Sequence, residues 1–213
     1  VENAYLLNGV PVPRKNDDGD AISFPVIDEF NSPDIADYWL SLRSRNLDFV
    51  NCRERSGFLR LYGSNPVTGK DETSMLLRRQ TGFSYEACTK IECRFANDGD
   101  AAGIICFQNE TFNYRLQLKK QGKVSIIQLI RAAGGEDEGL NEEVITGGTD
   151  FVPGVLRVVA EKQKLHFQCG PDERNMVTVA EEIDASILSV EKAGGFVGTV
   201  IGVFAVSGGE PSK

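Results

Sequence analysis

Histidine, tryptophan and methionine are scarce in this sequence, which has one His, one Trp and two Met among 213 residues. A Ser-His-Asp or Cys-His catalytic centre would have to use the single histidine, His166. Its neighbours Leu165 and Phe167 are apolar, so in a strand they point into the core and His166 points out. No nucleophile-elbow motif is present. The sequence therefore indicates neither of these two hydrolase types.

Long apolar runs and basic clusters are also missing. No stretch of 18 apolar residues could form a transmembrane helix, and residues 1–8 lack the pattern of an intact signal peptide. With 31 acidic and 23 basic residues the formal charge is −8, which argues against nucleic acid and anionic membranes as partners. The start at Val1 indicates a processed or cut chain. Cytoplasmic, periplasmic and secreted locations in a bacterium all stay open.

Metal and phosphate motifs are absent as well. The five cysteines form no CxxC pair and no Cys/His cluster, so zinc is not expected and the thiols are interpreted as reduced. The glycines Gly194, Gly195 and Gly198 precede no helix, unlike those of a phosphate-binding loop. We expect no cofactor, apart from a structural calcium for which Asp28, near the first strand, is a candidate ligand.

Short strands dominate the pattern. Residues Tyr85–Phe95 alternate between apolar and polar, which predicts a half-buried strand. The nearly continuous apolar run Ala101–Phe107 predicts a central strand covered on both faces. Further strands are expected at Phe58–Tyr62, Met75–Arg79, Tyr114–Lys120, Lys123–Ile130, Leu156–Ala160, Leu165–Gln168, Met176–Ala180 and Phe196–Val206. With no helical periodicity, this predicts an antiparallel all-β sandwich or barrel.

The chain divides into an arm and one domain. Residues 1–25 hold three prolines around a polar run, which is typical of a linker or arm. We expect residues 26–213 to form a single sandwich, since all-β domains of about 200–250 residues are common. Two loops stand out within it, Ser64–Ser74 and the Gly- and Glu-rich segment Ala132–Gly148, which is expected to be mobile.

Carboxylates do not form a catalytic motif. Glycoside hydrolysis needs two carboxyl groups on opposite sides of the sugar bond, and laminarinase-type sandwiches supply them from a Glu-x-Asp-x-x-Glu strand. The nearest match begins at Glu182 and Asp184 but ends on Ile187. The pairs Glu142-Glu143 and Glu181-Glu182 are interpreted as solvated charge. We therefore assign no catalytic residue to this chain.

Aromatic residues, at 8% of the chain, offer few platforms for sugar rings. The sugar-facing candidates are Tyr114, Arg115 and Arg78, because sugars stack on rings and their hydroxyls bond to polar groups. Core packing is the alternative for every ring. Other rings considered in the same role are Tyr38, Trp39, Tyr62 and Phe112.

Several segments form an ordered set from Asp28 to Ser207. They are Asp28-Glu29-Phe30, Arg53–Gly63, Arg78-Arg79-Gln80 with Phe83, Ala102-Gly103-Ile104, Asn113-Tyr114, Phe196-Val197-Gly198 and Gly202-Val203-Phe204-Ala205. Together they resemble the C-terminal concanavalin A-like domain of family 43 glycoside hydrolases, which are β-xylosidases and α-L-arabinofuranosidases. The resemblance implies a jelly-roll β-sandwich.

In that family an N-terminal propeller carries the three catalytic acids. The resemblance therefore implies an accessory domain that is not catalytic by itself, with the propeller and a pentose-containing glycan as partners. Arg78 and Arg79 are the candidates for ion pairs at the interface with the propeller.

A loop of the sandwich closes the substrate pocket with a Phe in β-xylosidases. The resemblance places this loop at Ser64–Ser74 and aligns Asp71 with that Phe, next to Glu72 and Thr73. This departure puts β-xylosidase specificity in doubt and leaves α-L-arabinofuranosidase or another glycan open. The family also ends with one more strand, whereas this chain ends at Lys213, so we expect a free sheet edge unless another segment covers it.

Two other functions stay open at this point. An autonomous carbohydrate-binding module requires a concave face with at least two exposed rings near Tyr114. A free-standing enzyme on the same fold requires two carboxylates that face each other across a cleft.

Overall fold

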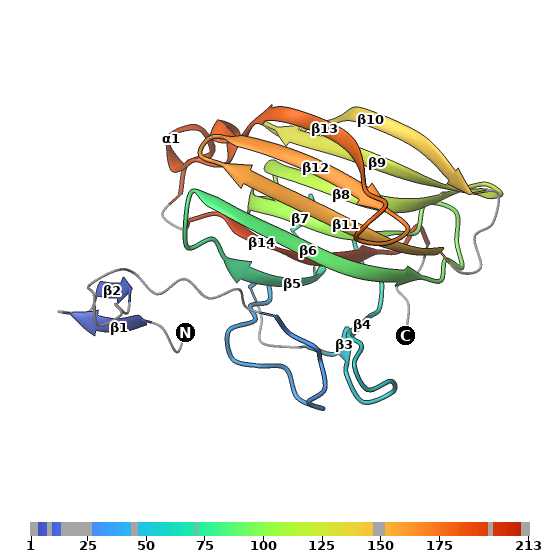
Figure 1. Cartoon of the computed structure of the whole chain (residues 1–213), viewed down its shortest axis with the longest axis horizontal. Helices are drawn as coiled ribbons and strands as arrows, with labels where there is room; N and C mark the ends of the chain where they lie inside the picture. The colour runs from blue at the N-terminus through green and yellow to red at the C-terminus, as the bar shows by residue number, and fades with distance from the viewer. Residues whose placement is uncertain are drawn as a thin grey trace.

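Two antiparallel sheets lie face to face in the computed structural model (Figure 1). The structure describes the backbone of residues 4–7 and 10–13, and residues 27–43, 47–70, 72–146, 152–195 and 198–209. The predicted all-β antiparallel sandwich is confirmed.

The larger sheet has six strands in the order β10-β9-β8-β7-β14-β5. Strands β7 to β10 follow one another as a meander, and β14 lies between β7 and β5. Gly122, at a φ of 60°, makes the tight turn from β8 to β9 that glycine favours. The bounds are β5 Ser74–Arg79, β7 Ala101–Asn109, β8 Phe112–Gln121, β9 Val124–Ala133, β10 Asp137–Thr146 and β14 Val200–Val206.

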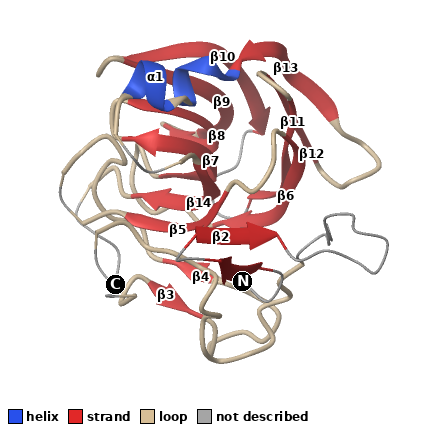
Figure 2. Cartoon of the chain, turned by 90° about the vertical axis from the view of Figure 1, so that its left-hand side faces the viewer, coloured by secondary structure: helices blue, strands red, loops and turns tan. Residues whose placement is uncertain are grey.

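The smaller sheet has four strands in the order β13-β12-β11-β6. Two short pairs and two short helices complete the described part, with the helices at one end of the sandwich (Figure 2). The bounds are β6 Ser84–Cys93, β11 Val152–Glu161, β12 Lys164–Gly170 and β13 Val177–Asp184; the pairs are β1 Ala4–Leu7 with β2 Val10–Pro13 and β3 Val50–Asn51 with β4 Arg60–Leu61; the helices are η1 Ala185–Leu188 and α1 Val190–Ala193.

The main core lies between the two sheets. Tyr114, Leu116 and Leu118 of β8 point inward, as their alternation predicts, and meet Leu156 and Phe167 of the smaller sheet. The Tyr114 and Phe167 rings lie 5.9 Å apart between centroids. The alternation predicted from Tyr85 onward is also present, because the residues of β6 are exposed and partly buried in turn.

A second apolar cluster covers the outer face of the larger sheet over β5, β14 and β7. Its buried members are Val67, Met75, Leu77, Ile105, Phe107 and Phe204, with Leu40 and Leu42 packed against them. Val67 belongs to the expected loop Ser64–Ser74, so this loop closes over the sheet. Strand β7 is therefore buried on both faces, as its continuous apolar run predicts.

One loop prediction was wrong. Most of the segment Ala132–Gly148 belongs to β9 and β10, which pair from Asp137↔Ala132 to Thr146↔Ser125. Its acidic residues are exposed on an edge strand, so the usual apolar signal of a strand is weak there. Register shifts at Gly139/Asn141 and Val144/Thr146 weaken the alternation further.

Other predictions fall partly outside the described residues. Of the expected linker 1–25 only the backbone of β1 and β2 is described, and these strands pair with each other. Among the described strands, β6 pairs with β11 alone and so has one free edge. None of the helices in the described ranges is long and apolar enough to cross a bilayer.

Asp100 ties the C-terminal segment to the start of β7. Its carboxylate accepts the N–H groups of Ala96, Asn97 and Gly208, each at 2.8 Å. Burial raises the pKa of Asp100, but these hydrogen bonds outweigh burial, so the pKa lies below the usual 3.8.

Asp100→Asn is expected to lower the free energy of unfolding by about 2–3 kcal/mol near neutral pH, because an amide NH₂ would face backbone donors. Since the folded-state pKa is lowered, the carboxylate stabilises fully above its unfolded pKa and loses this effect as the pH falls through the folded pKa. Urea unfolding of both proteins near neutral pH and near pH 3 should therefore show a smaller difference in acid. An equal difference at both pH values would contradict this role.

Candidate functional site

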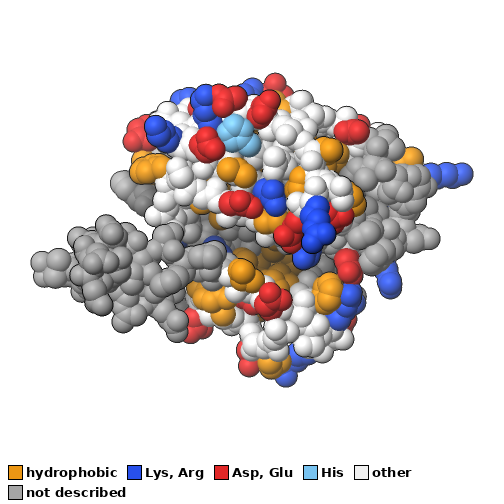
Figure 3. Space-filling model, viewed as in Figure 1, with side chains coloured by type: hydrophobic (Ala, Val, Ile, Leu, Met, Phe, Trp, Pro, Cys, Tyr) orange, Lys and Arg blue, Asp and Glu red, His pale blue; other side chains and the backbone are white. Residues whose placement is uncertain are grey.

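The acids of the incomplete catalytic motif have structural partners. The Asp184 carboxylate accepts the N–H of Ser186 at 2.9 Å and its hydroxyl at 2.7 Å, which caps η1 and lowers the pKa of Asp184. Glu182 pairs with Lys164 on β12. His166 lies at the outer surface of the smaller sheet, as predicted, with Nε2 4.0 Å from a Glu182 oxygen (Figure 3). Asp184 thus caps a helix, and Glu182 pairs with a neighbouring strand.

Residues 64–70 and 72–73, the described part of the segment 64–73 (the anchored loop), are fixed to the larger sheet. The Ser74 hydroxyl donates to the carbonyl of Tyr62 at 2.5 Å and lies 2.9 Å from the Ser64 hydroxyl. The carbonyl of Ser64 accepts the N–H of Ser207 at 2.8 Å. Val67 is fully buried in the apolar cluster beneath. The loop is thus held at both ends and in its middle.

The three residues expected at a substrate pocket differ in position. Asp71 lies outside the described residues. Glu72 is exposed, and its carbonyl accepts a hydrogen bond from the Asn65 side chain at 3.2 Å. Thr73 is buried, and its hydroxyl has no hydrogen-bond partner. The loop therefore presents Glu72 outward and turns Thr73 toward the sheet.

A small hollow of about 80 Å³ lies beside the anchored loop. It is lined by Glu72 and Thr73 together with Leu42, Asp48 and Phe49, among others. It contains two carboxylates, but both Asp48 and Glu72 are exposed, whereas the general acid of a glycosidase is typically held in apolar surroundings. The hollow is also smaller than the apolar cavity of roughly 150 Å³ that binds benzene in another protein. It lacks the form of a glycosidase cleft.

Asp28 organises an aromatic cluster. Its carboxylate accepts the Tyr38 hydroxyl, the Trp39 Nε1–H and the Phe30 N–H, each at 2.8 Å. Burial raises the pKa of Asp28, but these hydrogen bonds outweigh it and the pKa is lowered. Calcium needs six to eight oxygen ligands, and the described ranges contain no group of three metal-binding side chains. In this structure the Asp28 carboxylate binds three donors of its own chain, and calcium at Asp28 stays a prediction.

Arg78 belongs to the same cluster. Its guanidinium carbon lies 4.3 Å from the centroid of the Tyr38 ring and 5.6 Å from that of Trp39, as in a cation–π contact. Arg78 thus packs on rings of its own chain. Arg79, the next residue, is exposed at the end of β5, the edge strand next to the anchored loop.

Tyr114 is fully buried. Its hydroxyl donates to the carbonyl of Asp184 at 2.8 Å, and burial raises the pKa of Tyr114 to about 12. A ring with no accessible surface cannot stack on a sugar. The expectation of a sugar-facing Tyr114 is corrected: its alternative, core packing, is what the structure has.

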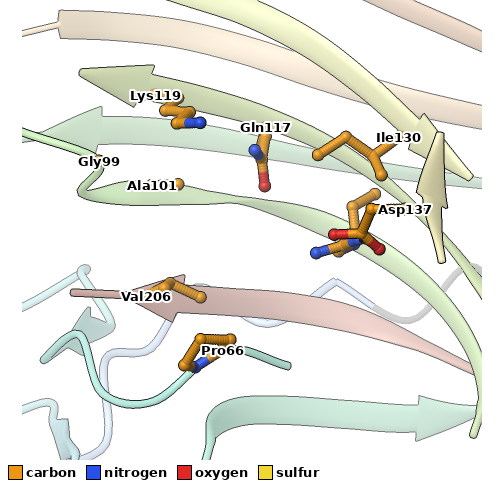
Figure 4. Close-up of a pocket in the computed structure, with 9 residues that line it drawn as sticks. Pro66, Gly99, Ala101, Gln117, Lys119, Ile130, Asp137 and Val206 are labelled. Atoms are coloured by element: carbon orange, nitrogen blue, oxygen red, sulfur yellow. Dashed lines mark hydrogen bonds and ion pairs between the residues drawn. The ribbon is translucent and has the colours of Figure 1, made fainter. Parts of the chain in front are cut away.

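Arg115, a sugar-facing candidate, lines a pocket. It points to the outer face of the larger sheet, where its side chain is only 7% exposed and pairs with Asp137 of β10. It shares with Gln117, Lys119 and Asp137 a pocket of about 150 Å³ (Figure 4). This outer-face pocket is walled on one side by Pro66 of the anchored loop.

Sequence reasoning missed Asp137 because its segment was interpreted as a loop. The alternation of Arg115, Gln117 and Lys119 against inward apolar residues did indicate a shared outer face. Across the sheet this face continues as a polar ladder, in which the Gln117 amide donates to Gln128 and the Gln128 amide donates to Glu142, both at 3.0 Å.

The model of the beta xylosidase C-terminal concanavalin A-like domain matches residues 27–213. The chain belongs to this family. The resemblance noted in the sequence is thereby confirmed, and the sandwich is of the concanavalin A-like type. The chain is accordingly the kind of C-terminal domain found in family 43 glycoside hydrolases, an accessory sandwich.

Two curated relatives agree with this assignment. A xylosidase/arabinosidase of Butyrivibrio fibrisolvens is 29% identical over 86% of this chain and 35% of its own length. A non-reducing end α-L-arabinofuranosidase of Bacteroides ovatus is 24% identical over 87% of this chain and 34% of its own length. The chain thus spans about a third of these relatives.

Solved structures show the same fold. The family 43 protein BlXynB of Bacillus licheniformis superposes with a TM-score of 0.78 at 23% identity, covering 94% of this chain and 43% of its own. At 23% sequence identity, the similarity between this chain and BlXynB shows a shared fold alone.

Proposed function

We propose that this chain packs against a family 43 catalytic propeller and helps to shape that enzyme's pocket for a pentose-containing glycan. Residues 1–25 would be the linker from the propeller and residues 26–213 the accessory sandwich. The observation that carries the proposal is the family match over residues 27–213. The names of the relatives, xylosidase/arabinosidase and α-L-arabinofuranosidase, favour a pentoside as substrate.

The anchored loop is the part proposed to reach the substrate pocket, through Asp71, Glu72 and Thr73. A wall of a binding site works best when its backbone is already fixed, since binding then costs little ordering. The bonds of Ser64 and Ser74 and the burial of Val67 supply that rigidity. Exposed Glu72 would then stand at a defined position beside the glycan.

The cleavage chemistry is proposed to belong to the propeller. One acid must protonate the leaving oxygen while a second carboxylate acts as base or nucleophile. The small hollow beside the anchored loop contains two carboxylates, Asp48 and Glu72, and both are exposed. This arrangement does not favour a free-standing enzyme.

An autonomous carbohydrate-binding module is not favoured by the rings. Tyr114 is buried, and Trp39 packs on Phe30 at 5.8 Å between centroids. The exposed aromatic residues in the described part of the chain are Phe58 and Phe83, and the Arg55 guanidinium covers Phe58 at 3.3 Å. A single uncovered exposed ring, Phe83, falls short of the pair that such a module requires.

Association of the two parts tests the proposal. The residues preceding the sandwich in the full-length polypeptide and the sandwich itself, produced separately, are expected to form a complex in size-exclusion chromatography. Arg79→Glu should weaken this complex at least about tenfold, because charge reversal at an interface costs several kcal/mol. Lys164→Glu, on the far sheet, is the matched control and should leave it unchanged. Separate elution of the unmodified parts would contradict the proposal.

A further inference from the structure

The outer-face pocket is built on the polar half of the larger sheet. Its floor is strand β8, which contributes Arg115, Gln117 and Lys119, and its walls are the anchored loop on one side and Asp137 of β10 on the other (Figure 4). We propose that this pocket binds one neutral sugar ring. The site is distinct from Asp71, Glu72 and Thr73, the residues of the loop that are proposed to reach the propeller's pocket.

Arg115 carries an unsatisfied hydrogen-bond donor. Arg115 is more than nine-tenths buried, yet its Nε–H has no hydrogen-bond partner. Another part of the guanidinium, Nη2, donates to Asp137. Buried polar groups are nearly always paired, so an arginine held this way is prepared for an acceptor from outside the chain.

The pocket combines basic, acidic and neutral polar side chains. Arg115 and Lys119 donate only, whereas the Asp137 carboxylate accepts only, and Gln117 can do both. A hydroxyl both donates and accepts, so neighbouring hydroxyls of one ring can satisfy both kinds of group at once. A small anion would meet the Asp137 carboxylate, and a cation would meet Arg115 and Lys119. The set therefore favours a neutral polyhydroxylated ligand.

The size and the apolar lining of the pocket also suit a sugar ring. The pocket measures about 150 Å³, a volume that holds one six-membered ring in another protein. Ile130, Val206 and Pro66 lie among the polar groups and can contact the C–H face of a sugar. No aromatic platform is required for a single ring held mainly by hydrogen bonds.

Titration of isotope-labelled protein with methyl β-D-xylopyranoside, followed by NMR, tests the proposal. The Arg115 Nε–H and Gln117 amide signals are expected to shift and to saturate with a dissociation constant on the order of 1 mM, as for a ligand of about ten heavy atoms. Xylotriose distinguishes the terminal sugar of a glycan from a monosaccharide as the ligand. An affinity for xylotriose equal to that for the methyl xyloside assigns the site to the end of a glycan. Absence of xylotriose binding assigns it to a monosaccharide.

Variants make the assignment specific. Arg115→Met should weaken binding at least about tenfold, since a charged hydrogen bond is lost, and Gln117→Ala provides a second variant should the first fail to fold. Arg131→Met is the matched control, because Arg131 also pairs with an acid of β10, Glu138, but from the opposite face. The proposal is overturned if the xyloside fails to saturate these signals, if acetate shifts them instead, or if Arg131→Met weakens binding as much as Arg115→Met.

Discussion

Tyr114→Ala is expected to lower the free energy of unfolding by about 3–5 kcal/mol, as for other large aromatic residues removed from a core. The ring is fully buried against Phe167, and its removal leaves a cavity between the sheets. The substitution also takes away the donor to the Asp184 carbonyl, where η1 begins. Chemical denaturation at equilibrium measures the loss, which is a large part of the stability of a typical domain.

Tyrosine-to-phenylalanine changes separate the hydroxyl from the ring. Tyr114→Phe should cost about 1 kcal/mol, because one buried hydrogen bond is lost while the packing stays. Tyr62→Phe is the matched control: its hydroxyl bonds to Glu54 near the surface at 2.6 Å, where water replaces the partner. A Tyr114→Ala protein as stable as the unmodified chain would show that Tyr114 is not a core residue.

Removal of residues 27–213 from the full-length polypeptide is expected to lower kcat/KM for a nitrophenyl pentoside by at least about 100-fold. In the proposed arrangement the anchored loop forms one wall of the pocket, and small displacements of a positioned substrate cost rates of this order. A loss carried mainly by KM would indicate that the sandwich contributes binding, and a loss carried by kcat that it orients the reacting groups.

The control for this deletion is a variant that keeps the sandwich but changes its far side. Lys164→Ala on β12 removes a surface ion pair with Glu182, which is worth little, and should leave kcat/KM within twofold, about 0.4 kcal/mol. Unchanged activity of the truncated polypeptide would mean that the sandwich contributes nothing to the pocket.

The strands could be predicted because burial imposes a period of two. Tyr85–Phe95 is half buried and alternates, and Ala101–Phe107 lies under a second apolar layer and is continuously apolar. The edge strand β10 could not be predicted in this way, because both its acidic composition and its register shifts hide the period. Because β10 was not predicted, Asp137, the partner of Arg115, was not recognised as part of the site.

The site was harder to predict than the fold, because side-chain partners are set by distant contacts. Asp28 was predicted only as a candidate calcium ligand, and the sequence did not show that Tyr38 and Trp39, ten and eleven residues on, donate to its carboxylate. Alternation correctly predicted that Arg115 and Tyr114 lie on opposite faces of the sheet, although both were proposed to face a sugar and Tyr114 is buried. Alternation could not show that the inner face of the larger sheet is buried against the smaller sheet, whereas part of its outer face forms a pocket.

An assay of this chain alone with nitrophenyl β-D-xylopyranoside and nitrophenyl α-L-arabinofuranoside shows directly whether the sandwich cleaves pentosides. An accessory role predicts no release of nitrophenol above the buffer rate, and no difference when Asp48→Asn and Glu72→Gln are introduced together. Catalytic turnover of either pentoside by the unmodified chain, abolished in the double variant, would contradict it and assign the chemistry to the sandwich itself.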